Sequence, residues 1–170
     1  MPTLIQRARE FDVKATHAMA VHGILLLRVS LGIVFLWFGF LKFFDDLSPA
    51  EDLAIRTTRV LTFGMIPDAI AINVLAAWES LIGLLLILRR FLRLTILLLL
   101  LQMVGAVAPI FLFPSEAFIR IPYAPTLEGQ YIIKNIVLIS AALVIGATVR
   151  GGGLVADPDS CEEEVEEAQT

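Results

Sequence analysis

The sequence predicts an all-α membrane protein folded as an antiparallel bundle of four transmembrane helices. Hydrophobic residues make up 58% of the 170 residues, and the mean hydropathy is +0.83. A soluble domain has nowhere to bury this much apolar surface, and its long helices usually carry a polar stripe. Crossing a bilayer takes roughly 20 consecutive apolar residues. Four segments are long enough: residues 22–44, 66–88, 92–113 and 131–149.

An amphipathic helix is expected ahead of the first span. In residues 1–21, charged side chains separate apolar positions at Leu4, Ile5, Ala8, Phe11 and Ala15. This pattern predicts a helix lying on the membrane surface. The apolar run that follows is longer than that of a cleaved signal peptide, so we expect it to remain as a signal anchor.

The first span carries two cations on one helix face. Arg28 and Lys42 are fourteen residues apart, which at about 100° per residue brings both to the same side of a helix. Gly32, Phe35 and Gly39 share that face. A charge facing lipid at the bilayer centre costs about 2.5–3.5 kcal/mol, and small residues let helices approach closely. This face is therefore predicted to point into the bundle.

The loop after the first span contains a helix-start signal. Ser48 and Pro49 are followed by the acidic residues Glu51 and Asp52. Proline and carboxylates are both favoured in the first turn of a helix. We expect a short interfacial helix over about residues 50–63, on the outer side of the membrane.

Glu79 in the second span is the expected partner of Arg28. Counted from the predicted span ends at 1.5 Å per residue, their depths in the membrane differ by only about 5 Å. Two interpretations of the pair are open. It could be a salt bridge that only sets the register of the bundle, or it could act on a ligand or a proton, since ionisable groups inside a membrane are functional candidates.

Further polar residues lie in or near the predicted spans. The three-residue connection at 89–91 makes the second and third spans antiparallel neighbours, and Gln102 is near the middle of the third. Lys42, Lys134 and Asn135 lie toward the outer ends of the first and fourth spans. The lysines could extend to the lipid headgroups, or they could line a basic pocket for an anionic or carbonyl-bearing ligand. Gln102 could join two helices or contact the same ligand. The proline-containing loop at 114–130 is expected to be irregular.

The distribution of basic residues predicts the orientation. With four spans, both termini share a side with the 89–91 connection, and this side carries Arg7, Arg9, Lys14, Arg89, Arg90, Arg93 and Arg150. The opposite loops carry Arg56, Arg59 and Arg120, and Lys42 and Lys134 lie near the span ends on that side. Because cytoplasmic loops are enriched in lysine and arginine, both termini are expected in the cytoplasm.

The C-terminal residues 151–170 have a different composition from the rest of the chain. They contain seven of the 17 acidic residues and no basic residue, which predicts a solvated, disordered tail. Without the tail, the remainder is net basic, with ten acidic against thirteen basic residues.

Several kinds of chemistry are not expected within this chain. Cys161 is the only cysteine, so neither an intrachain disulfide nor a CxxC redox pair can form. The only histidines, His17 and His22, precede or begin the first span, and they argue against an internal bis-histidine haem or a zinc site. No phosphate-binding glycine motif is present, and we expect no nucleic-acid partner. A diffusible cofactor or a partner subunit would have to supply most of the chemistry.

Three segments together resemble the DoxX-like family of four-span membrane proteins. "LLRVSLGIVFLWFGFLKFF" resembles the family's first helix, and "WESLIGLLLILRRFLRLTILLLLLQM" resembles its second helix, basic turn and third helix. "GQYIIKNIVLISAAL" is similar to the start of its last helix. The positions that match the family's motifs are Arg28, Gly32, Gly39, Lys42, Glu79, Gly83, Lys134 and Asn135.

The resemblance implies a four-helix bundle in the bacterial inner membrane. The family includes the small subunit of a thiosulfate:quinone oxidoreductase and membrane components of oxidant-defence complexes, and related four-span proteins act as assembly factors. The cysteine pairs of its thiol-redox relatives are missing here, which argues against disulfide exchange.

The leading hypothesis is a redox-system component that binds a quinone or similar lipid-soluble ligand. Glu79 and Arg28 would be the catalytic pair, and Lys42, Lys134, Asn135 and Gln102 would contact the ligand. A partner redox subunit or a homo-oligomer is possible within this hypothesis. The alternatives are a non-enzymatic membrane scaffold or assembly factor, and a transporter of a small solute or ion.

Overall fold

Four long apolar helices form the body of the protein in the computed structural model, which describes residues 4–44, 51–152 and 154. Within these residues, the helices long and apolar enough to cross a membrane are Phe11–Leu41, Asp68–Ile87, Leu92–Leu112 and Leu127–Arg150. The predicted all-α membrane fold is confirmed. The acidic tail, apart from its first few residues, lies outside the described part.

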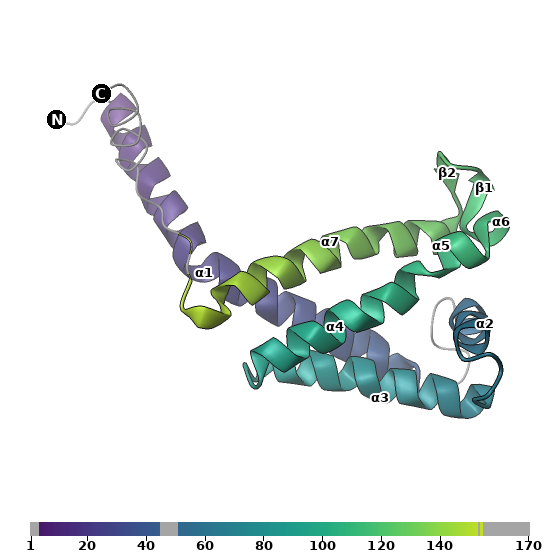
Figure 1. Cartoon of the computed structure of the whole chain (residues 1–170). Coiled ribbons are helices and arrows are strands. Elements are labelled where there is room, and N and C mark those ends of the chain that lie inside the picture. The colour runs from purple at the N-terminus through teal and green to yellow at the C-terminus, as the bar shows by residue number, and fades with distance from the viewer. Residues whose placement is uncertain (1–3, 45–50, 153, 155–170) are drawn as a thin grey trace, which may run out of the picture.

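Helix α1 (Leu4–Leu41) is a single helix of 38 residues. It differs from the expected surface helix at 1–21 followed by a separate span at 22–44, because no break occurs between them. The junction contains no proline and is rich in alanine and leucine, which favour helix continuation. Figure 1 shows the N-terminal half of α1 extending well beyond the ends of the other helices.

Helices α1 and α3 (Asp68–Ile87) make the most extensive contact in the bundle. Glycines allow this close approach. A Cβ atom built on Gly83 would lie 2.3 Å from the backbone nitrogen of Leu36 and 2.6 Å from the carbonyl oxygen of Gly32. A Cβ atom on Gly39 would lie 2.6 Å from the backbone nitrogen of Ser80. The predicted inward orientation of the glycine face of the first span is confirmed.

Helix α4 (Leu92–Val107) follows α3 after a tight turn, as expected. Arg89 and Phe91 in this turn have positive φ angles of 54° and 50°. The expected third span, 92–113, is interrupted at Pro109, which starts the short helix α5 (Pro109–Leu112). Proline has no backbone N–H and cannot continue the ladder of helical hydrogen bonds.

The fourth span begins earlier than expected. Helix α7 (Leu127–Ala147) is capped by Thr126, whose hydroxyl accepts a hydrogen bond from the backbone N–H of Gly129 at 3.1 Å. The same hydroxyl donates to the carbonyl of Glu116 at 2.6 Å. The helix therefore starts four residues before Tyr131, and it is followed by the 3₁₀ helix η1 (Thr148–Arg150).

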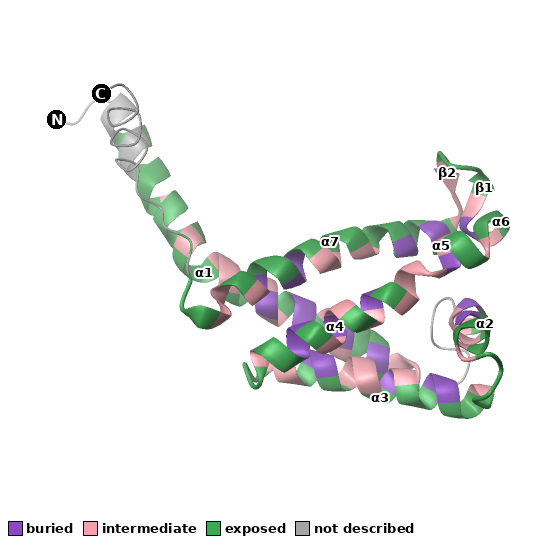
Figure 2. Ribbon diagram, viewed as in Figure 1, coloured by how far each residue is buried: buried purple, intermediate pink, exposed green. Residues whose placement is uncertain are grey.

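The packed core occupies the half of the bundle near the α3–α4 turn. Figure 2 shows many of the buried residues where the four helices meet and others toward the opposite end, while exposed residues cover the outward faces. Many of these exposed residues are large and apolar, as expected for helices in contact with lipid. The buried cluster consists of Leu31, Phe35, Ile82, Leu86, Ile96, Leu99, Met103, Ala141, Ala142 and Ile145.

The opposite end of the bundle, called the α2 end below, is formed by short elements. Helix α2 (Glu51–Leu61) confirms the helix predicted over 50–63, and Figure 1 shows it between α3 and α5. The segment expected to be irregular contains helix α6 (Pro114–Ala117) and an antiparallel hairpin of β1 (Phe118–Arg120) and β2 (Ala124–Pro125).

Candidate functional site

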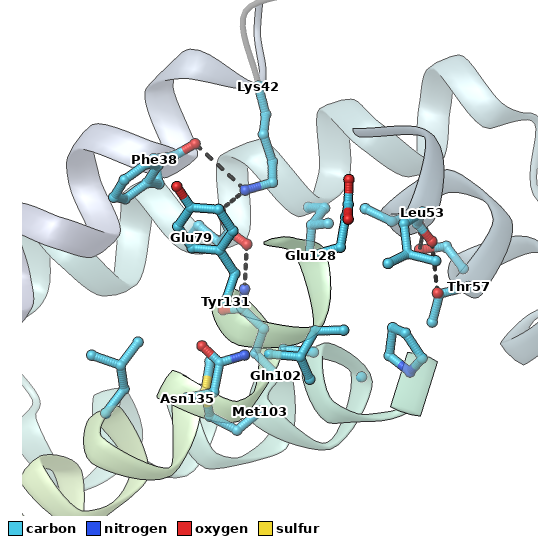
Figure 3. A pocket seen from close by; sticks show the side chains of 18 of the residues that line it. Phe38, Lys42, Leu53, Thr57, Glu79, Gln102, Met103, Glu128, Tyr131 and Asn135 are labelled. Carbon is cyan, nitrogen blue, oxygen red and sulfur yellow. Dashed lines mark hydrogen bonds and ion pairs between the residues drawn. The ribbon is translucent and has the colours of Figure 1, made fainter. Parts of the chain in front are cut away.

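A cavity of about 390 Å³ lies between the helices at the α2 end of the bundle. Residues from α1, α2, α3, α4, α5 and α7 line it, and most of them are apolar (Figure 3). Pockets that bind small molecules are typically mainly apolar and roughly 300–1,000 Å³ in volume. Pro109, at the start of α5, also lies in the wall of the cavity.

An ion pair lies in the wall of the cavity. The ammonium nitrogen Nζ of Lys42, just beyond the end of α1, is 2.5 Å from Oε2 of Glu79 on α3. The two side chains are only 13% and 12% exposed. Nε2 of Gln102 on α4 donates to the other carboxylate oxygen of Glu79 at 2.6 Å. We call these three residues the Lys42–Glu79–Gln102 cluster, and Figure 3 shows it at the edge of the cavity.

The cluster satisfies both carboxylate oxygens of a largely buried acid. Removing two charges from water costs several kcal/mol per ion unless the charges are paired and hydrogen-bonded. Here the members come from α3, from α4 and from the residue that directly follows α1, so the cluster joins these three parts of the bundle. The predicted placement of Gln102 between helices is thus observed, and it also lines the cavity.

The predicted contact between Arg28 and Glu79 is wrong. Nη1 of Arg28 instead donates to the carbonyl oxygen of Leu86 and, at 3.1 Å, to that of Ile87. These carbonyls are at the C-terminal end of α3, where the regular helical hydrogen bonds end and the helix dipole is negative. The carbonyl of Leu86 also accepts a hydrogen bond from the backbone N–H of Arg89 at 3.2 Å. Glu79 lies about 11 Å farther along the helix axis, beyond the reach of Arg28.

Lys134 and Asn135 line the cavity from α7. Nζ of Lys134 lies 5.4 Å from the centre of the Tyr131 ring, a distance at which a cation is attracted by the aromatic face. No described hydrogen bond connects Lys134 or Asn135 to the Lys42–Glu79–Gln102 cluster. The structure therefore brings five of the six predicted site residues to one cavity and places Arg28 elsewhere.

Two features of the cavity were not predicted. Tyr131 is not among the predicted site residues, but it shares the cavity wall with Asn135 and Leu138. Spacings of four and seven residues lie on one helix face, so this signal was available in the sequence. The second feature is α2, whose residues Leu53 and Thr57 are buried and line the cavity.

Two exposed ion pairs hold α2 at this end of the bundle. Arg56 binds the carboxylate of Glu116 on α6 through two nitrogen atoms, one at 2.7 Å. Arg59 binds Asp68 at the start of α3 in the same way, with Nε at 3.2 Å. The hydrogen bond to Glu116 raises the pKa of Arg56 above its ordinary value.

The arrangement defines a multi-pass membrane protein with a polar cluster in the wall of an otherwise apolar cavity. The sequence model of the DoxX family matches residues 23–113, which is more than half of the chain. The protein belongs to the DoxX family. The matched region contains all three residues of the Lys42–Glu79–Gln102 cluster and ends before α7.

Comparisons with curated proteins and with solved structures give no match.

Proposed function

We propose that the protein binds a quinone or a similar lipid-soluble ligand in this cavity, as a component of a redox system of the bacterial cytoplasmic membrane. The observation that carries the proposal is the Lys42–Glu79–Gln102 cluster, which exposes polar groups to an apolar cavity of about 390 Å³. The proposed orientation has both termini in the cytoplasm, as the distribution of basic residues predicts.

The cavity has apolar walls and polar groups, and these suit the apolar parts and the oxygen atoms of such a ligand. The apolar walls from α1, α4 and α7 match an aromatic ring and an aliphatic tail. A quinone oxygen needs a hydrogen-bond donor, and an ammonium group has three. Lys42 uses one N–H on Glu79, and its 3.5 Å contact with the carbonyl of Phe38 is long, so a donor remains for the ligand. Lys134 and Asn135 offer donors from α7.

Glu79 is the group best placed to handle a proton. A carboxylate in contact with an ammonium ion and lining a ligand cavity can accept or return a proton through short hydrogen bonds. Reduction or oxidation of a quinone requires such an exchange. Arg28 has a different role in this proposal: it holds the end of α3 and does not touch the ligand.

The test is to measure quinone in protein purified gently from its own membranes. Organic extraction, chromatography and redox difference absorbance should reveal quinone in stoichiometric amount. A Glu79→Gln variant should lose most of it, whereas the matched variant Glu116→Gln should retain it, because Glu116 lies outside the cavity. Absence of quinone together with co-purification of other proteins in a fixed ratio would contradict the proposal and favour a scaffold or assembly factor.

A further inference from the structure

The wall of the cavity is not equally covered by protein on all sides. Where α3, α4 and α5 form the wall, every lining residue is buried or partly buried. Phe38 of α1 and Tyr131 of α7 also line the cavity, yet these residues are 44% and 48% exposed. The other exposed lining residues are Glu128 and Lys134 of α7 and Leu61 of α2. The exposed part of the wall thus belongs mainly to α1 and α7.

Helices α1 and α7 run apart toward this end of the bundle. Both contribute to the packed core, α1 through Phe35 and α7 through Ala142, and Figure 1 shows them separating from there toward the α2 end. Helix α2 covers a different side, because its main contacts are with α3, α4 and α5. Its exposed residue Leu61 lies against α4, where a Cβ atom on Gly105 would be 4.0 Å from it. The cavity is therefore open between α1 and α7.

The size of the cavity limits how much of a lipid-soluble ligand it can hold. Its volume of about 390 Å³ is near the lower end of the range for small-molecule pockets. It suits a ring and the first part of a tail, so the rest of a long tail must leave the cavity. Phe38 and Tyr131 lie within the apolar spans Phe11–Leu41 and Leu127–Arg150. The opening beside them therefore leads into the hydrocarbon of the bilayer, where an apolar tail is favoured.

We propose that the cavity opens sideways into the lipid between α1 and α7 and takes a long-tailed lipid as its ligand, an inference that rests on the function proposed above. The ring lies against the Lys42–Glu79–Gln102 cluster, and the alkyl or isoprenoid tail leaves between Phe38 and Tyr131. A ligand that is insoluble in water then enters directly from the bilayer. Phe38 and Tyr131 contact the tail, so they determine specificity for long-tailed ligands, whereas the cluster contacts the ring.

The first experiment locates the tail directly. A decyl-ubiquinone analogue with a photoreactive diazirine at the end of its tail is bound to the full-length protein in lipid nanodiscs. After illumination, the labelled residues are identified by mass spectrometry. Because free probe in the lipid also labels outward faces, only labelling that excess decyl-ubiquinone abolishes is counted. This labelling should lie on α1 and α7 around Phe38 and Tyr131, and labelling on the other helices instead would refute the proposal.

The second experiment narrows the opening and compares two probes, decyl-ubiquinone and the same ring with a methyl group in place of the decyl tail. Phe38→Trp should weaken binding of the decyl probe several-fold, because a larger side chain occupies the path of the tail. It should leave binding of the methyl probe unchanged. Phe40→Trp is the matched control, since Phe40 is exposed on α1 outside the cavity, and it should change neither affinity. If Phe38→Trp does not fold, the wild-type labelling still decides the question.

The outcomes separate this inference from the proposed function. Binding of both probes with the tail labelling α2, α3, α4 or α5 would refute the opening and leave ligand binding intact. Equal effects of Phe38→Trp on the two probes, or no effect on either, would refute the role of Phe38 in the path of the tail. Failure of both probes to bind the wild type would refute the proposed function itself, and the inference with it.

Discussion

Replacing Gly83 by alanine tests whether close packing of α1 on α3 holds the bundle together. The added Cβ atom would lie 2.3 Å from the backbone nitrogen of Leu36 and 2.6 Å from the carbonyl oxygen of Gly32. Atoms in contact normally rest about 3.5–4.0 Å apart. Both neighbours belong to the backbone of α1, so no side chain can rotate away and the two helices must separate by about 1 Å.

Two effects of opposite sign determine how much Gly83→Ala changes the free energy of unfolding. Alanine is favoured over glycine inside a helix by about 1 kcal/mol. Overpacking a tight contact costs about 1–3 kcal/mol, and occasionally more. A backbone clash belongs at the upper end of this range, so we expect Gly83→Ala to lower the free energy of unfolding by about 2 kcal/mol.

The assay is equilibrium unfolding in mixed detergent micelles, followed by tryptophan fluorescence and circular dichroism. Gly146→Ala is the matched control, because a Cβ atom there would lie 3.5 Å from a side-chain carbon of Ile96, an ordinary contact. This control should be as stable as the wild type, or more stable by up to about 1 kcal/mol. Equal stability of the two variants would refute the packing argument.

Three further predictions concern the charged residues. Lys42→Met and Glu79→Gln should each lower the free energy of unfolding by about 3 kcal/mol, because each leaves a largely buried partner unpaired. The double variant should lose less stability than the sum of the two single variants. Additive losses in a double-mutant cycle would contradict this coupling. Arg28→Leu should lower the free energy of unfolding by about 1–3 kcal/mol, because the hydrogen bonds to the end of α3 are lost. The amount of bound quinone should not change. Loss of quinone at wild-type stability would contradict this and show that Arg28 acts directly on the ligand. Arg56→Gln should lower the free energy of unfolding only slightly, because the pair with Glu116 is exposed. The difference from the wild type should shrink at about 1 M salt. A large loss of stability that is independent of salt would contradict this.

Much of the fold could be predicted because the membrane imposes local requirements. A spanning helix must be long and apolar over its whole length, so the spans are visible in the sequence without knowledge of their partners. The glycine face of the first span was also predictable, because fourteen residues bring Arg28 and Lys42 to one side. Helix α2 was predictable from its start signal, but its position against the cavity was not.

The pairing of charges could not be predicted from depth alone. The depths of Arg28 and Glu79 depend on where the spans end, and an error of a few residues at each end moves a side chain by several ångströms. The partners of Arg28 are also backbone atoms and not side chains. Leu86 and Ile87 give no polar signal in the sequence, yet their backbone carbonyls are the groups that bind Arg28.

The sequence by itself therefore determined which segments cross the membrane and which residues are polar inside it, because both follow from local composition and helical periodicity. Only the tertiary structure decided that Glu79 pairs with Lys42 and that Gln102 completes the cluster. It also decided that Tyr131, Lys134 and α2 meet around the same cavity. The physical reason is that these contacts depend on how far packed helices slide and cross, and a close approach such as that of α1 and α3 at Gly83 sets those positions.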